Sequence, residues 1–207
     1  MGTTRAYKPS ELTRYVSDQV LDNSYWHYFL MLESDFIKTL QFVQLDETNF
    51  QTYSLEFAKQ LICISSEFET IAKLLCKQIN GSNAGNIEQY KKVILQRYPK
   101  IALTPVYIDQ HKKMTIYPLK PWEHEGGKIN WWNAYNNIKH ERHSHFQSAT
   151  LEHTLHALGS LLILESYLYC LAYPTPQNIQ FGTKLIRVPG LAEPLYAQSG
   201  KLPDFES

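Results

Sequence analysis

Apolar side chains recur every three or four residues along two long stretches of the chain. The first stretch, residues 23–43, carries them at Tyr25, Phe29, Leu32, Phe36, Leu40 and Val43. This spacing marks one face of an amphipathic α-helix. In the second stretch the same spacing continues from Phe50 to Ile79. It predicts a helix over about 46–79, which would be about 50 Å long at ~1.5 Å per residue.

Turn-forming residues then divide the chain into shorter elements. The Asn/Gly-rich run 80–86 ends the long helix, and a short helix is expected over about 87–97. After Tyr98-Pro99, two β-type runs at 101–108 and 112–119 flank Asp109-Gln110-His111, which predicts a β-hairpin. Helical spacing resumes over about 129–146 and 148–172. Gly159-Ser160 in the last helix would let another helix approach closely, within the bundle or across a two-fold axis, or would serve plain packing.

The composition changes after residue 173. Five of the ten prolines fall in residues 174–203, with a short strand pair expected near 179–181 and 184–188. We expect this tail to wrap the helices or to pair with the hairpin. The predicted fold is therefore mainly α: an antiparallel bundle of four to five helices, a small inserted β-hairpin at about 101–119 and an extended, proline-containing C-terminal tail. Residues 1–172 form the bundle domain, with the insertion at about 99–121, and residues 173–207 are an appendage on it.

Membrane and secretion signals are weak. The apolar run 155–172 is interrupted by His156, Ser160 and Glu165, and it is shorter than the ~20 apolar residues of a membrane span. The N-terminus lacks the apolar core of a secretory signal. We therefore expect a cytoplasmic protein without a membrane partner.

Charge is unevenly distributed, although the whole chain has 20 basic and 20 acidic side chains. Residues 91–145 carry 10 basic and 4 acidic side chains, a net charge of +6, and five of the eight histidines. A polyanionic partner would be drawn to this part. The alternative is an ordinary solvated surface that acidic neighbours balance in the fold.

The segment from Trp131 to Phe146 contains the aromatic, amide, histidine and arginine side chains that binding and catalytic sites use. At about 100° per residue, one face carries Trp131, Tyr135, Ile138, Arg142 and Phe146. Arg142 on this apolar face needs a carboxylate such as Glu67 or Glu69, an aromatic ring or a cleft. The other side carries hydrogen-bonding groups suited to phosphate, base edges or a subunit contact, namely Asn133, Asn136, Asn137, His140 and His143.

Several classes of site are disfavoured. His140, His143 and His145 resemble metal ligands, but their spacing is not that of an HExxH zinc motif. There is no glycine-rich phosphate loop, nucleophile elbow or Cys/His nucleophile pair. We expect neither a metal nor a cofactor.

Three segments resemble the HEPN superfamily of small helical-bundle proteins. They are Tyr53-Ser54-Leu55-Glu56-Phe57, Ser66-Glu67-Phe68-Glu69 and the run Trp131-Trp132-Asn133-Ala134-Tyr135-Asn136-Asn137-Ile138-Lys139-His140-Glu141-Arg142. The resemblance covers about residues 22–172. It implies a toxin, abortive-infection or RNA-processing protein. Many members are metal-independent ribonucleases with an active site at a homodimer face, where both subunits supply an Arg and a His.

The usual HEPN motif is Arg, four to six residues, then His. Arg142 is followed at those positions by Gln147, Ser148 and Ala149, so any active site here is a variant. In that site we expect His140 as general acid or base and Asn137 orienting it, with Arg142 and Lys139 stabilising the phosphate. The expected substrate-binding residues are Asn133, Asn136, His143 and His145.

Two functional hypotheses follow. The first is a homodimer that binds RNA or cleaves it as a metal-independent endoribonuclease, in a defence or toxin–antitoxin pathway with an antitoxin or another protein as partner. It predicts an accessible basic strip in a cleft between two subunits. The alternative is a non-catalytic interaction module that dimerises or holds a partner protein, and it predicts Arg142 buried against Glu67 or Glu69.

Overall fold

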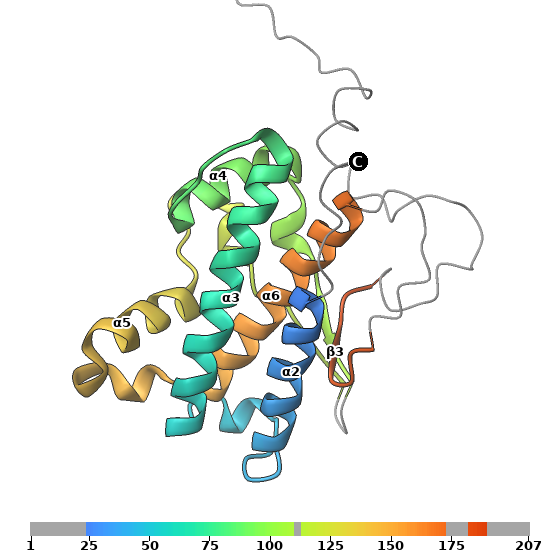
Figure 1. The fold of residues 1–207 in the computed structure, drawn as a ribbon. Helices are drawn as coiled ribbons and strands as arrows, with labels where there is room; N and C mark the ends of the chain where they lie inside the picture. The colour runs from blue at the N-terminus through green and yellow to red at the C-terminus, as the bar shows by residue number, and fades with distance from the viewer. Residues whose placement is uncertain (1–23, 110–112, 173–181, 190–207) are drawn as a thin grey trace, which may run out of the picture.

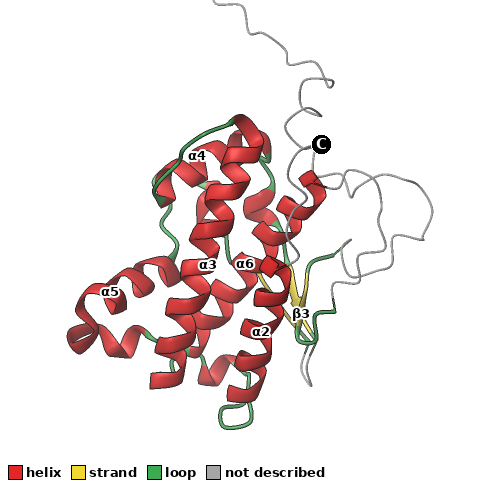
Figure 2. Cartoon of the chain, viewed as in Figure 1, coloured by secondary structure: helices red, strands yellow, loops and turns green. Residues whose placement is uncertain are grey.

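The computed structural model describes residues 24–109, 113–172 and 182–189 (Figure 1). These residues form five α-helices and one small three-stranded antiparallel sheet (Figure 2). The prediction of a mainly α fold with a small hairpin is confirmed. Most of the predicted appendage, residues 173–207, lies outside the described residues.

Two long helices form the centre of the bundle. Helix α3, Leu55–Asn80, packs against α6, Leu151–Ala172, and α2, Ser24–Thr39, contacts both (Figure 1). Helix α4, Ile87–Arg97, packs on α3, whereas α5, Asn130–His145, contacts α3 and α6. The core lies between α2, α3 and α6, where most of the predicted apolar stripes are buried, although Tyr53 is exposed.

The predicted long helix is two elements. Asp46 Oδ1 accepts a hydrogen bond from the backbone N–H of Thr48 at 3.0 Å and caps a short 3-10 turn, Glu47–Asn49. Ser54 Oγ accepts from the backbone N–H of Phe57 at 3.0 Å, so α3 begins at Leu55 and not near residue 46. Because side-chain caps fix helix starts, they override the apolar spacing that continues through this region.

The end of α3 and the whole of α4 agree with the prediction. Gly81 has a φ of +72°, and its N–H bonds the carbonyl of Lys77 at 2.8 Å, which ends α3 in the left-handed conformation that glycine tolerates. Asn86 Oδ1 then accepts from the N–H of Gln89 at 3.0 Å and caps α4.

The sheet has the order β2-β1-β3. Strands β1, Val106–Ile108, and β2, Met114–Ile116, form the predicted hairpin, and residues 101–103 form a 3-10 turn before it. Strand β3, Ile186–Arg187, pairs with the other edge of β1, with Arg187 opposite Tyr107. This part of the tail therefore pairs with the hairpin, while the predicted strand at 179–181 lies outside the described residues.

The sheet packs on α6 at Gly159. A Cβ atom at this position would lie 3.3 Å from Cδ1 of Ile116 and 3.4 Å from Cγ of Pro118. The small residue therefore admits the hairpin on this side of α6. Among the described residues, α6 is also the helix with the length and composition to cross a membrane, but most of it is buried in the bundle as a core helix.

Candidate functional site

Aromatic side chains hold α5 against the bundle. The rings of Phe68 on α3 and Trp131 on α5 meet edge to face, with centroids 4.9 Å apart, and the Trp132 ring lies 5.9 Å from Phe68. Trp131, Tyr135 and Ile138 are buried, as the spacing predicted for this face. The first ten residues of α5 therefore have a fixed orientation on the bundle.

The opposite side of α5 carries the predicted polar strip. Asn133, Asn137 and His140 are exposed. Asn136 is half-buried, and its Nδ2 donates to the backbone carbonyl of Trp132 at 3.0 Å. Three members of the strip therefore face solvent, and a fourth bonds its own helix. The fifth, His143, lies beyond Glu141 in the sequence and is also exposed.

A break in the helix separates this strip from Arg142. Glu141 has φ −138° and ψ 50°, which is not helical, so the 100° progression ends there. Arg142 consequently leaves the apolar face and is exposed. The predicted burial of Arg142 against Glu67 or Glu69 is wrong, because the helical extrapolation does not hold through Glu141.

Glu67 and Glu69, the expected partners of Arg142, are not paired with it in the structure. Glu69 Oε1 lies 2.8 Å from Lys73 Nζ and accepts from the hydroxyl of Tyr90 at 3.4 Å. Glu67 is half-buried, and burial raises the pKa of its carboxyl.

The C-terminal part of α5 carries two cations and three histidines and is called here the α5 basic end. Its members are Lys139, His140, Arg142, His143 and His145. Lys139 Nζ donates to the Tyr135 hydroxyl at 3.2 Å and lies 5.2 Å from the ring centroid. This hydrogen bond raises the pKa of Lys139, which stays charged at neutral pH. His145 Nε2 is 3.5 Å from a carboxylate oxygen of Glu141.

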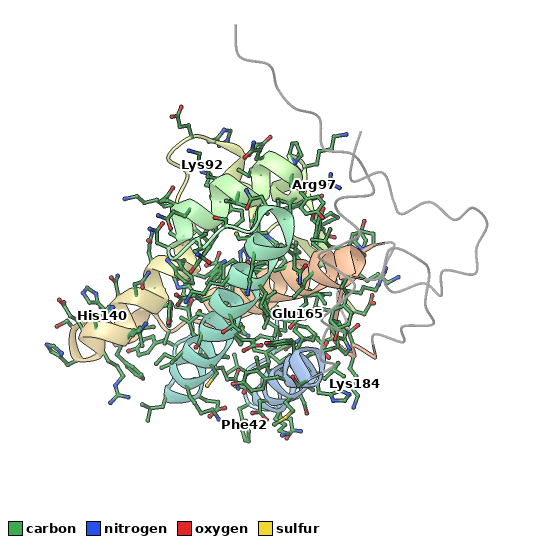
Figure 3. All side chains as sticks on the ribbon, turned by 45° about the horizontal axis from the view of Figure 1, so that its top comes forward. Phe42, Lys92, Arg97, His140, Glu165 and Lys184 are labelled. Carbon is green, nitrogen blue, oxygen red and sulfur yellow. The ribbon has the colours of Figure 1, made fainter. Side chains whose placement is uncertain are left out.

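The remaining three members of the α5 basic end face solvent. His140, Arg142 and His143 are exposed, and within the described ranges no hydrogen bond or ion pair involves their side chains. Figure 3 shows His140 near the outer end of α5, away from the core. Cations in the last turn also favour the helix itself, because its C-terminus carries partial negative charge.

His153 is a further histidine that is not part of the predicted site. It is in the first turn of α6, and residues 146–150 connect α5 to this helix. His153 Nδ1 is 2.8 Å from the carbonyl oxygen of Ser148. A carbonyl only accepts, so Nδ1 carries the hydrogen and Nε2 is the basic nitrogen. Thr150 is the sequence feature that could have indicated His153. The Thr150 hydroxyl oxygen caps α6 by accepting a hydrogen bond from the backbone N–H of His153, three positions later, at 3.2 Å.

One buried acid lies elsewhere. Glu165 is fully buried, and within the described residues neither of its carboxylate oxygens has a hydrogen-bond partner. Burial, with the negative charge of Glu67 as a second cause, raises the pKa of Glu165 to about 8. Figure 3 places Glu165 among the central helices, away from His140. Twelve residues along α6, about 18 Å, separate Glu165 from His153.

Metal ligands are not gathered in the described part of the chain. No group of three or more His, Cys, Asp or Glu side chains there could hold a metal ion. His140, His143 and His145 thus do not converge as ligands. Comparison with protein-family models, curated proteins and solved structures gives no match for this chain.

Proposed function

We propose that the chain is an HEPN-like homodimer that binds RNA through the α5 basic end. The exposure of Arg142 carries the proposal. An exposed guanidinium without an ion-pair partner in the described ranges is available to bind phosphate through two parallel hydrogen bonds. Lys139 adds a second cation and three histidines add hydrogen-bonding groups around it, inside the segment of the chain that has a net charge of +6.

The exposed amides favour RNA over a simple anion. Asn133 and Asn137 lie on the same side of α5 as His140, within one or two helical turns of the cations. Side-chain amides bond base edges and the 2′-hydroxyl, whereas phosphate contacts position the strand. A surface with both groups suits single-stranded RNA, whose bases are accessible.

The same residues support metal-independent cleavage. His140 removes the proton of a 2′-hydroxyl, whose oxygen attacks the adjacent phosphorus as the 5′-oxygen leaves with a proton from a second acid. Arg142 and Lys139 stabilise the negative charge that develops on the phosphoryl oxygens. Asn137 lies three residues before His140 on the same exposed side of α5, and in this proposal it orients the His140 ring when RNA is bound. His153, with Nδ1 held by Ser148, is the second histidine of this proposed site.

A cleavage assay tests this chemistry. Purified protein is incubated with a mixed, end-labelled RNA pool in EDTA, beside His140→Ala, His153→Ala and Arg142→Ala. We expect wild-type cleavage that each variant reduces at least 100-fold, the usual size of an acid–base contribution. Lys92→Ala is the matched control, because Lys92 is an exposed cation on α4 (Figure 3). Equal cleavage by wild type and all three site variants would assign the activity to a contaminant.

The second candidate function is a non-catalytic interaction module. Three large apolar side chains far from the α5 basic end in sequence favour it, since Phe42, Leu55 and Met31 are exposed. Such side chains on a soluble surface mark contact with another protein. A chain that binds no RNA and yet forms a specific protein complex would have this function.

A further inference from the structure

Helix α2 has one side that faces solvent in the described part of the chain, and apolar side chains lie on it. Its members are spaced by three or four residues and are Ser24, His27, Tyr28, Met31, Asp35 and Lys38. Met31 is 64% exposed, and Tyr28, one turn before it, is 37% exposed. Residues on the other sides of α2 contact α3, α6 and the segment that leads into β3. We call the solvent-facing side the outer stripe of α2.

The polar end of the outer stripe is satisfied, whereas its apolar end is not. Lys38 Nζ lies 2.8 Å from Asp35 Oδ1, so these two charges neutralise each other on the helix. Tyr28 is hydrogen-bonded to Cys63, which ties its hydroxyl to α3. Met31 is left with most of its surface in water, and covering it with another apolar side chain would be favourable.

The residues that precede α2 contain one amphipathic segment, 11–20. At about 100° per residue, four apolar side chains share one face of this segment, namely Leu12, Tyr15, Val16 and Val20. The charged side chains on its other side are Glu11, Arg14 and Asp18. Ser10, just before the segment, is a residue type favoured as a helix N-cap, and an acidic residue in the first turn suits the positive N-terminus of a helix. The sequence of this segment therefore favours a helix with one apolar face.

A short connection ties the segment to α2. Residues 21–23 alone separate the two, and Asp22 and Asn23 are types favoured in turns and at helix N-caps. Helices joined by about two to five residues are antiparallel neighbours. The tether also holds the segment beside α2 at a roughly millimolar effective concentration, which a separate molecule would have to exceed. The chain itself thus supplies the nearest apolar surface to the outer stripe.

The lengths of the two stretches match. With residues 21–23 as the turn, Val16 is level with Tyr28. Leu12 is then level with the helical turn that holds Met31, about 10 Å from Ser24 at ~1.5 Å per residue. We propose that residues 11–20 form a helix that packs antiparallel on the outer stripe of α2. Its Leu12 covers Met31, and its Val16 covers Tyr28.

The reactivity of an introduced thiol in the full chain tests the proposal. Met31→Cys is alkylated with N-ethylmaleimide, and mass spectrometry of peptides separates this thiol from Cys63, Cys76 and Cys170. We expect the rate at position 31 to rise about tenfold when Leu12→Glu and Val16→Glu are introduced together. The reason is that the docked segment shields the thiol until it opens, and two charges on its apolar face prevent docking.

Two controls separate docking from other effects. Ser17→Glu adds a charge to the polar side of the segment and should leave the rate at position 31 unchanged. Phe42→Cys lies in the turn after α2, outside the covered stripe, so its rate should be the same with or without Leu12→Glu and Val16→Glu. Circular dichroism checks the folding of every variant, and His27→Cys on the same stripe replaces Met31→Cys if that variant does not fold.

Two results would overturn the proposal. One is a rate at position 31 that Leu12→Glu and Val16→Glu together leave unchanged. The other is a shielding of position 31 that grows with protein concentration, since a tethered segment shields equally at every concentration and a second copy does not. RNA has no part in the measurement, so its outcome is independent of the proposed function.

Discussion

The carboxylate of Glu33 accepts a hydrogen bond from the backbone N–H of Lys184 at 3.0 Å, across 151 residues of sequence. The same carboxylate accepts from the N–H groups of Leu185 at 2.9 Å and Ile186 at 3.2 Å. Glu33 is buried on α2, so this cluster joins the helical bundle to the strand β3. Outside it, Arg187 Nε bonds Asp109 Oδ2 at 2.7 Å and links β3 to the hairpin.

Replacing this carboxylate should destabilise the protein. Glu33→Gln keeps one acceptor oxygen but turns an amide donor toward backbone N–H groups that need an acceptor. We expect the free energy of unfolding to fall by about 2 kcal/mol, the size of a lost hydrogen bond to a charged group. Urea unfolding measures this, with Glu125→Gln as the exposed control. An unchanged midpoint for Glu33→Gln would show that the cluster does not contribute to stability.

The buried acid Glu165 should make stability fall as pH rises. Its pKa is raised from 4.5 to about 8 in the folded chain. At pH values between 4.5 and 8, Glu165 is ionised in the unfolded chain but protonated in the folded chain. Each rise in pH in this range therefore lowers the free energy of unfolding. The loss is complete by about pH 8 and amounts to about 5 kcal/mol.

Glu165→Gln removes this titration. We expect the variant to unfold at a similar urea concentration to wild type near pH 4.5 and at a clearly higher one at pH 8. Glu67→Gln is the companion variant, because Glu67 is the second cause of the raised pKa. A difference between wild type and Glu165→Gln that stays constant from pH 4.5 to 8 would contradict a buried, neutral Glu165.

Position 159 should accept the methyl group of alanine but not a larger side chain. The Cβ of Gly159→Ala would lie 3.3 Å from Ile116 Cδ1, a tight contact that the flexible end of that side chain can relieve, and alanine favours helix by about 1 kcal/mol. We therefore expect Gly159→Ala to be close to neutral. Gly159→Leu should lower the free energy of unfolding by about 1–3 kcal/mol, because the hairpin must move. Thermal unfolding of the two variants measures this, and a Leu variant as stable as the Ala variant would mean that the hairpin does not pack there as described.

Local signals in the sequence were sufficient for much of the fold. Asn86 and Tyr98-Pro99 mark both ends of α4, and the apolar stripe of α2 places Phe29 and Phe36 in the core. The start of α3 was misplaced because Phe50 and Tyr53 continue its spacing, although the Ser54 cap separates them from the helix. The contact of Glu33 with residues 184–186 depends on tertiary packing, which no local pattern encodes.

The candidate site was only partly predictable. Helical periodicity placed Trp131 and Tyr135 inward and Asn133, Asn137 and His140 outward. It failed for Arg142, because one non-helical residue, Glu141, changes the direction of every side chain after it. His153 was overlooked because its orientation comes from a hydrogen bond to Ser148 across the turn between α5 and α6.

The most direct test of RNA binding by the α5 basic end is fluorescence anisotropy of a labelled single-stranded RNA, titrated with wild type, Arg142→Ala and Lys92→Ala at several salt concentrations. If Arg142 binds a phosphate, its loss should weaken binding about five- to tenfold and reduce the slope of log K against log salt by about 0.7. Lys92→Ala should match wild type. Equal affinity and equal slope for Arg142→Ala and wild type would contradict the account.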